Sequence, residues 1–370
     1  MTDNRIVPIV MPKWGLSMKE GKVTGWLMED GTKINVGDAI LEVETDKIAG
    51  SVEASDAGVL RRRVGSADTV YPVKALLGVI ADQSVPETEI DAYVAAYVMP
   101  VAEEGDDDQG PKTEIAETPA GSLRYAKRGS GGETVILIHG FGGDLDNWLF
   151  NIDALAETAT VYALDLPGHG QSVKSMAKPG LASMTSALAG FMDKLGIASA
   201  HLIGHSMGGA IAMQTALDHP AKVKSLTLIA PLGLGSEIGP YVGNFTQAQG
   251  RKDLKPVLET LFADKSLVSR QLIDDVMKYK RLDGVEQILK ELGKGLFDNG
   301  RQRDAPGAKL AGKLPPTLVI WGKEDQVIPA AHAGNLARAQ VHVLDKAGHM
   351  VFMEKAGETN ALVRKHIARQ

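Results

Sequence analysis

A change of pattern along the chain most constrains what it can fold into. Residues 5–82 carry short, β-rich runs separated by turn residues, whereas strand-like and helix-like segments alternate from Leu123 onward in the 370-residue chain. Short runs at close spacing predict a small all-β sandwich or flattened barrel. Alternating strands and helices predict a doubly wound α/β fold. The sequence therefore predicts two unrelated domains.

An acidic segment separates the two halves. Residues 99–121 contain seven acidic residues and one lysine, interrupted by Pro and Gly, and such a composition cannot bury enough apolar surface to fold alone. We expect a flexible linker there, an all-β domain over residues 1–98 and an α/β domain over residues 122–370. Amphipathic helical segments interrupt the α/β alternation at about 233–313, where we expect a helical cap over the site.

Composition excludes several classes of function. The chain has no cysteine, so disulfides, thiolate metal sites and a cysteine nucleophile are excluded; this fits the cytoplasm, where we expect the protein to be. We expect no signal peptide and no membrane span. The net charge is −5 over residues 1–98, −6 over 99–121 and +5 over 122–370. A basic catalytic domain would suit an anionic co-substrate, or simply keep the surface soluble; we expect neither a nucleic-acid partner nor a metal site.

A serine in the second half has the context of a nucleophile. Gly204-His205-Ser206-Met207-Gly208 follows the strand-like run Ala200–Gly204 and precedes an Ala-rich helical segment. A serine at such a sharp turn is presented at the sheet edge, and the flanking glycines let neighbouring backbone approach closely. The alternative interpretation is an ordinary serine that caps the helix N-terminus.

A serine nucleophile needs a base that an acid orients. Asp325 and His349 each follow a predicted strand, and they stand in the chain order serine, acid, histidine. Glu324 is the competing acid. We interpret the other nearby histidines as structural: His169, His205, His332 and His342.

Catalysis at a carbonyl also needs hydrogen-bond donors for the oxyanion, and backbone N–H groups supply them with little reorganisation. Met207, directly after the nucleophile, should supply one donor. Phe141 lies in a Gly-rich run, residues 139–143, that follows a predicted buried strand, and we expect its N–H to supply the second. These motifs resemble the α/β-hydrolase superfamily over residues 123–370, which implies the fold and a serine triad but not the substrate.

Lys47 is the candidate for a modified residue in the first half. Taken alone, a lysine between two predicted strands would be an ordinary solubilising residue. Its context, however, is Glu44-Thr45-Asp46-Lys47, preceded by Met11-Pro12-Lys13-Trp14-Gly15-Leu16-Ser17-Met18 and followed by Gly58. These motifs resemble the lipoyl domains of 2-oxo acid and acetoin dehydrogenase complexes over residues 5–82. The resemblance implies a flattened barrel with lipoate amide-linked to Lys47 at a hairpin tip.

Biotin-carrier domains share this barrel and are the alternative. They usually place a methionine beside the modified lysine, whereas Asp46 and Ile48 flank Lys47 here. The neighbours therefore favour lipoate over biotin.

The two halves together resemble the dihydrolipoyl acetyltransferase components of bacterial acetoin-cleaving systems. The resemblance implies that an acetyl group passes from S-acetyl-dihydrolipoyl-Lys47 to CoA, through Ser206 or directly. It also implies two partners, a thiamine-diphosphate-dependent acetoin dehydrogenase component and a dihydrolipoyl dehydrogenase. The His-x-x-x-Asp-Gly motif of 2-oxo acid acyltransferases does not occur, so we do not expect their large cubic core.

Two other functions stay open at this point. A lipoyl-bearing thioesterase or ester hydrolase would use water as the acceptor. A noncatalytic carrier and assembly subunit would keep the hydrolase fold without its chemistry, although the complete set of Ser206, Asp325 and His349 argues against this.

Overall fold

The structure is a computed structural model in which the chain forms two compact units, with the division at Pro111. It describes the whole chain except residues 1–4, 13–17, 46–48, 55, 100–112 and 311. Lys47, part of the Met11–Met18 motif and most of the predicted linker therefore lie outside the described residues. No helix in the described ranges is both long and apolar enough to cross a membrane.

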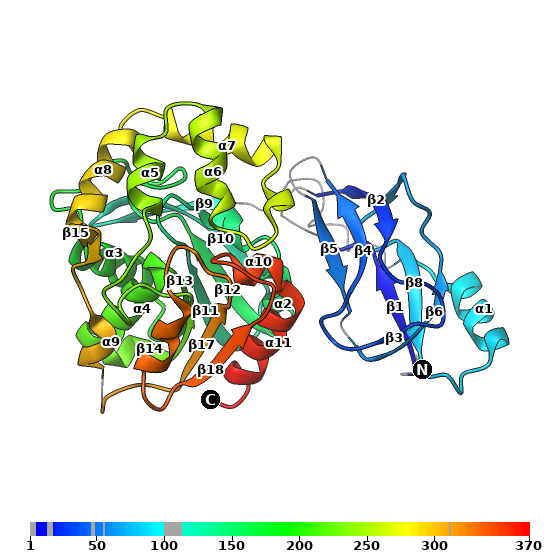
Figure 1. Cartoon of the computed structure of the whole chain (residues 1–370). Coiled ribbons are helices and arrows are strands. Elements are labelled where there is room, and N and C mark those ends of the chain that lie inside the picture. The colour runs from blue at the N-terminus through cyan, green and yellow to red at the C-terminus, as the bar shows by residue number, and fades with distance from the viewer. Residues whose placement is uncertain (1–4, 13–17, 46–48, 55, 100–112, 311) are drawn as a thin grey trace. The chain divides into compact units, whose positions relative to one another are not determined.

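Within the described part of residues 5–99, two four-stranded antiparallel sheets form the N-terminal unit (Figure 1). Their strand orders are β1-β8-β6-β3 and β5-β4-β2-β7. The strands are β1 (Ile6–Val10), β2 (Glu20–Trp26), β3 (Lys33–Ile34), β4 (Ala39–Glu44), β5 (Ala49–Glu53), β6 (Gly58–Arg63), β7 (Thr69–Pro72) and β8 (Leu76–Ala81). This arrangement confirms the predicted all-β sandwich.

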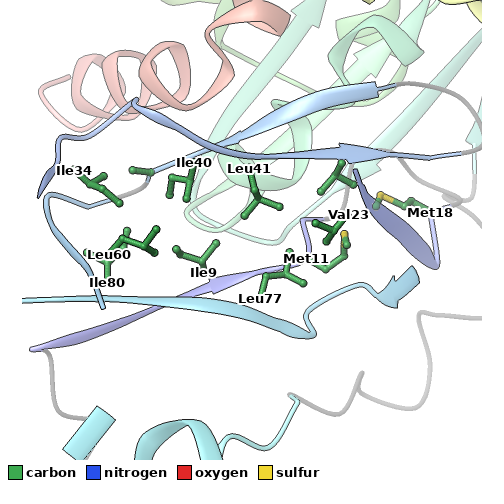
Figure 2. Packing of buried hydrophobic residues seen from close by; sticks show 12 residues of the cluster. Ile9, Met11, Met18, Val23, Ile34, Ile40, Leu41, Leu60, Leu77 and Ile80 are labelled. Carbon is green, nitrogen blue, oxygen red and sulfur yellow. The ribbon is translucent and has the colours of Figure 1, made fainter. Parts of the chain in front are cut away.

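Aliphatic and methionine side chains fill the space between these sheets (Figure 2). Strand β4 shows how the sequence achieves this. The pairing of β4 with β5 shifts register between Ala39 and Leu41, and both Ile40 and Leu41 are fully buried. A bulge of this kind breaks strict alternation and lets two successive side chains face the core. Each such burial contributes about 1.5–3 kcal/mol.

Helix α1 (Glu87–Ala96) covers the outer side of strand β8. Its Ile90 is fully buried in a second apolar cluster that includes Val79 and Val85. Strand β8 is consequently buried along its whole length.

In the described residues from 113 onward, an eight-stranded sheet forms the centre of the C-terminal unit, in the order β18-β17-β14-β13-β11-β12-β10-β9. The pairs from β12 to β18 are parallel, whereas β10 pairs antiparallel with both β9 and β12. The strands are β9 (Thr113–Thr118), β10 (Gly121–Arg128), β11 (Glu133–Ile138), β12 (Ala159–Leu164), β13 (Ala200–His205), β14 (Val223–Ile229), β17 (Thr317–Gly322) and β18 (Gln340–Leu344). The sheet confirms the predicted α/β class.

Strand β9 corrects the predicted linker, which was expected to extend to residue 121. Thr113–Thr118 pairs with β10 from Ala126 to Gly121 and forms the edge of the sheet. Most of its side chains are exposed and only Ala116 is buried. Its polar composition therefore resembles a linker, although backbone hydrogen bonds to β10 make it a strand.

Helices cover both sides of the sheet. Helices α3 (Leu181–Lys194) and α4 (Met207–Asp218) pack on one side. The other side carries α2 (Ile152–Ala156), α10 (Val351–Glu354) and α11 (Ala356–Ile367) (Figure 1). Short 3-10 helices connect these elements: η1 (Leu145–Trp148), η2 (Pro220–Lys222), η3 (Lys265–Leu267) and η4 (Ala330–Asn335).

Between β14 and β17 the chain forms a helical insertion, as predicted. Four helices gather at one end of the C-terminal unit (Figure 1): α5 (Tyr241–Gln247), α6 (Arg251–Glu259), α7 (Arg270–Lys280) and α8 (Val285–Leu296). We call these four helices, together with the segments that connect them (residues 241–296), the cap. The insertion ends with β15 (Phe297–Asp298), β16 (Arg301–Gln302) and α9 (Pro306–Lys309).

Candidate active site

Ser206 occupies the turn between β13 and α4. Its backbone has φ +53° and ψ −116°, a conformation that strains any residue other than glycine. A Cβ added to Gly204 would lie 2.3 Å from the Gly208 carbonyl oxygen, and one added to Gly208 would lie 2.1 Å from that of Ile138. Only glycine fits at either position, so the two glycines of the motif make the sharp turn possible.

Hydrogen bonds hold this strained residue in place. The Ser206 N–H donates to the Ile229 carbonyl at 3.0 Å, and the Ser206 carbonyl accepts from Leu232 N–H at 2.9 Å. The Ser206 side chain makes no capping bond to helix α4. The geometry therefore favours a presented nucleophile over an ordinary helix-capping serine.

Asp325 and His349 come together as the sequence predicts. The His349 Nδ1–H donates to Asp325 Oδ2 at 2.8 Å. Trp321 Nε1–H donates to the same oxygen at 2.9 Å, and the N–H groups of Val327 and Ile328 donate to Oδ1 at 2.7 and 2.9 Å. These bonds fix the carboxylate, which fixes the imidazole as the Nδ1–H tautomer. His349 Nε2 is thereby left as the basic nitrogen.

The competing acid has a different partner. Glu324 Oε2 accepts the Ala347 N–H at 3.0 Å, and the Glu324 side chain is exposed. The geometry therefore favours Asp325 as the residue that orients His349.

His205 connects the nucleophile turn to the loop that holds His349, residues 345–350, which we call the histidine loop. Its Nε2–H donates to the His349 carbonyl at 3.1 Å, and the two imidazole rings lie 4.6 Å apart. Burial lowers the pKa of His205 well below its usual value, so this histidine is neutral and structural. No hydrogen bond joins Ser206 Oγ to His349 Nε2 among the described residues. Such catalytic contacts are often loose without substrate and tighten when it binds.

The predicted oxyanion donors lie close to the nucleophile. Met207 begins α4 directly after Ser206, and a Cβ on Gly140, next to Phe141, would lie 3.1 Å from Ser206 Cβ. Neither the Phe141 nor the Met207 N–H has an acceptor in the part of the chain that the structure describes. Two unpaired donors beside a serine are what an oxyanion hole requires.

Two buried histidines stabilise the Gly-rich run at residues 139–143, which we call the oxyanion loop. His139 Nδ1–H donates to the Gly140 carbonyl at 2.7 Å, and its Nε2 accepts the Leu166 N–H at 3.0 Å. Burial lowers the pKa of His139 to about 4. Burial also lowers the pKa of His169 to about 3, with His139 as a further cause, and the two rings lie 4.9 Å apart. Both are neutral residues that pack behind the loop.

The remaining histidines considered from the sequence have other partners. His332 Nε2 pairs with Glu237 Oε2 at 2.8 Å, and His342 Nε2 accepts from Gln340 Nε2 at 2.7 Å. Neither contact involves the serine, and both agree with a structural interpretation.

Lowering the pH from 7 to 5 should destabilise the C-terminal unit. The pKa of His139 is about 4 in the folded chain against an ordinary 6.5, so the unfolded chain binds more protons in this range. Stability is therefore lost as the pH falls through 6.5 toward 4, by about 2 kcal/mol at pH 5 for one such histidine. Urea unfolding at both pH values measures this loss.

His139→Gln is the informative comparison, because its amide can donate to Gly140 and accept from Leu166 without titrating. The free energy of unfolding of this variant should depend less on pH than that of the wild type. Equal pH dependence in the two proteins would show that His139 does not contribute.

Comparison with known proteins identifies both units. Residues 133–356 match the α/β hydrolase fold family, and residues 7–76 match the family described as biotin-requiring enzyme. The dihydrolipoyllysine-residue acetyltransferase component of the acetoin cleaving system of Cupriavidus necator is 55% identical over 98% of this chain and 97% of its own length. The chain belongs to this acetyltransferase family. A Pseudomonas putida member is 47% identical over 98% of this chain and 100% of its own length.

A solved structure resembles the hydrolase unit of this acetyltransferase family member. A mutant of the meta-cleavage product hydrolase CumD from Pseudomonas fluorescens IP01, complexed with acetates, has a TM-score of 0.64 and 27% identity. The match covers 69% of this chain and 97% of the hydrolase. Family membership confirms the predicted combination of lipoyl and α/β-hydrolase domains.

Sequence reasoning did not assign two residues that shape this site in the acetyltransferase. His139 stands at the start of the Gly-rich run, and its polar side chain directly after an apolar strand was the available signal. Glu354, whose Oε2 accepts the Gly348 N–H beside His349 at 2.6 Å, lies five residues after His349, and nothing in its local sequence distinguishes it from a surface glutamate.

Proposed function

We propose that this chain is a dihydrolipoyllysine-residue acetyltransferase that transfers an acetyl group from a lipoyl arm on Lys47 to CoA. The observation that carries the proposal is the 55% identity to such an acetyltransferase over 98% of the chain. The hydrogen-bonded His349 and Asp325 beside the strained Ser206 agree with an active rather than a vestigial hydrolase domain.

A lipoyl group amide-linked to Lys47 would, in its reduced dithiol form, supply a thiol that carries the acetyl group as a thioester. The strands on either side of Lys47 fit such a site. Strands β4 and β5 pair antiparallel with Glu44 opposite Ala49, so a connection of only four residues holds the lysine. A lysine in so short a connection between paired strands is well placed to present an arm.

Ser206 and His349 then perform the transfer by a ping-pong mechanism. His349 Nε2 takes the proton from Ser206 Oγ as this oxygen attacks the thioester carbonyl carbon. The carbon–sulfur bond breaks, and the leaving thiolate receives the proton from His349. CoA thiol next gives its proton to His349, and its sulfur attacks the carbonyl carbon of acetyl-serine. The bond between that carbon and Ser206 Oγ breaks, and Oγ regains the proton from His349. Asp325 holds His349 and stabilises its positive charge in each step.

The N–H groups of Phe141 and Met207 would stabilise the negative charge on the carbonyl oxygen in both tetrahedral intermediates. Removing one donor of this kind typically costs about 10²–10³ in kcat. The Gly140–Phe141 segment therefore contributes to the proposed transfer together with the triad.

A transferase must also keep water from the acetyl-serine, and we assign this role to the cap. A thioesterase with water as acceptor is the competing function. With S-acetyl-dihydrolipoamide and CoA, we expect acetyl-CoA as the main product of the wild-type protein. Acetate as the main product would instead support the thioesterase.

We propose that the arm receives its acetyl group from a thiamine-diphosphate-dependent acetoin dehydrogenase component and is reoxidised by a dihydrolipoyl dehydrogenase. The names of the related proteins, which refer to acetoin cleaving systems, support this. The absence of cysteine agrees with the cytoplasm as the compartment.

The lipoyl domain at residues 1–98 and the hydrolase domain, which begins at β9, would be joined by the acidic residues 99–112. The five acidic residues of this segment, Glu103, Glu104 and Asp106 to Asp108, would repel one another. A tether of this kind would hold the arm at a high effective concentration near the site.

A further inference from the structure

Glu354, at the end of α10, binds two separate loops at once. In the described residues its Oε2 accepts the Gly348 N–H at 2.6 Å, and its Oε1 accepts the N–H groups of Ala263 and Asp264 at 2.8 and 3.1 Å. Gly348 directly precedes His349, whereas Ala263 and Asp264 follow cap helix α6. One carboxylate therefore joins the histidine loop to the cap.

A backbone hydrogen bond on the other side of His349 reinforces this contact. The Met350 N–H donates to the Leu261 carbonyl at 3.0 Å. A Cβ added to Gly348 would lie 2.8 Å from both Leu261 O and Ala263 N, so the two loops are in direct contact there. His349 is thus attached to the cap segment through both of its sequence neighbours.

The cap also contacts the oxyanion loop. A Cβ on Gly142, whose φ is +75°, would lie 2.8 Å from the Phe245 ring of cap helix α5. The rings of Phe245 and Phe141 lie 6.3 Å apart in a T-shaped arrangement. Helix α5 packs on α6, so the cap contacts both the sequence neighbours of His349 and the oxyanion loop.

We propose that Glu354 is a positioning residue that couples the cap to His349, so that His349 reaches Ser206 in reacting geometry only while the cap excludes water. The inference rests on the proposed serine mechanism, because it assigns Glu354 a role through His349. A mutation far from the chemistry that misplaces a reacting group by about 1 Å can cost about 10² in rate. Loss of the coupling should therefore slow the reaction and also admit water.

Two isosteric substitutions separate this role from a merely structural one. Glu354→Gln keeps the shape but offers one acceptor oxygen where both carboxylate oxygens now accept, and its NH₂ group faces an N–H donor. Glu324→Gln is the matched control. Glu324 binds the same histidine loop, at Ala347, through a single oxygen, and the glutamine oxygen can accept that bond.

The experiment uses the full-length chain with S-acetyl-dihydrolipoamide and CoA, and measures kcat, KM and the ratio of acetyl-CoA to acetate. We expect Glu354→Gln to lower kcat about 10²-fold with little change in the KM for CoA, and to raise the share of acetate. Glu324→Gln should match the wild type. Equal kcat and product ratios in the two variants, measured on equally folded protein by circular dichroism, would overturn the inference.

Glu354→Asp covers the case in which Glu354→Gln does not fold. It keeps both oxygens but shortens the side chain by one methylene, so one loop should be held less closely. We expect a smaller loss of kcat with a raised acetate share, and an unchanged share would overturn the coupling. A wild-type protein that produces only acetate would contradict the proposed transferase function. The comparison of kcat between Glu354→Gln and Glu324→Gln would still decide the role of Glu354.

Discussion

Replacing Ser206 by alanine should reduce acetyl-CoA formation from S-acetyl-dihydrolipoamide by at least about 10³-fold, because the nucleophile is lost while substrate binding and the oxyanion donors remain. The substitution removes one oxygen from a residue whose side chain makes no capping bond. We therefore expect the fold to be retained, as circular dichroism can check. Acetyl-CoA release, followed with purified protein, measures the loss.

Substitution of the other two triad residues should also lower the rate of acetyl-CoA formation. His349→Ala should fall about as far as Ser206→Ala, and Asp325→Asn somewhat less. Ser186→Ala is a matched control, because Ser186 lies exposed on α3 and bonds only to its own helix among the described residues. Its rate should equal that of the wild type. Near-normal acetyl-CoA formation in Ser206→Ala would mean that the acetyl group passes to CoA without this serine.

The turn at Ser206 was predictable because its requirements are local. A strand, two glycines that admit close backbone, a serine and a helix stand in one continuous stretch of sequence, and a Cβ at either glycine would lie within 2.3 Å of a backbone atom. The buried strands β11, β13 and β14 were predictable for a similar reason, since strands buried on both faces are apolar throughout. In such segments one local pattern has one structural interpretation.

Features that depend on distant contacts were not predictable in this way. Strand β9 is polar, and its pairing with β10 rather than its composition makes it a strand. Strand β3 spans only two residues, too few to show a pattern. Glu354 acquires its partners from Ala263 and Asp264, about 90 positions away along the chain. No rule based on the spacing of residues in the sequence relates positions that far apart.

The pairing of base and acid lies between these cases. The sequence placed Asp325 and His349 after successive strands, and it left Glu324 open as the acid because the two carboxylates are adjacent. The structure distinguishes them through direction, since Asp325 faces His349 Nδ1 and Glu324 faces the Ala347 N–H. Side-chain direction at a loop depends on its hydrogen bonds, and here the partners come from loops that follow two different strands, β17 and β18.

Replacing Lys47 by alanine should abolish lipoylation of the chain. After co-expression with a lipoyl ligase, the intact mass of the wild-type protein should rise by one lipoyl group, and that of Lys47→Ala should not rise. The reason is position, because Lys47 lies in the four-residue connection between the paired ends of β4 and β5. Lys33→Ala is the matched control, since Lys33 is exposed at the start of strand β3 and should leave the mass increase intact.

The same substitution separates the carrier from the catalyst. Lys47→Ala should still transfer acetyl groups from free S-acetyl-dihydrolipoamide to CoA, because Ser206, His349 and Asp325 belong to the other unit. Transfer that begins at the thiamine-diphosphate component should stop, because no arm remains to carry the acetyl group. A lipoyl group that persisted in Lys47→Ala would refute the assignment of the modified lysine. Loss of activity toward the free thioester as well would show that the arm, or its unit, takes part in the hydrolase site itself.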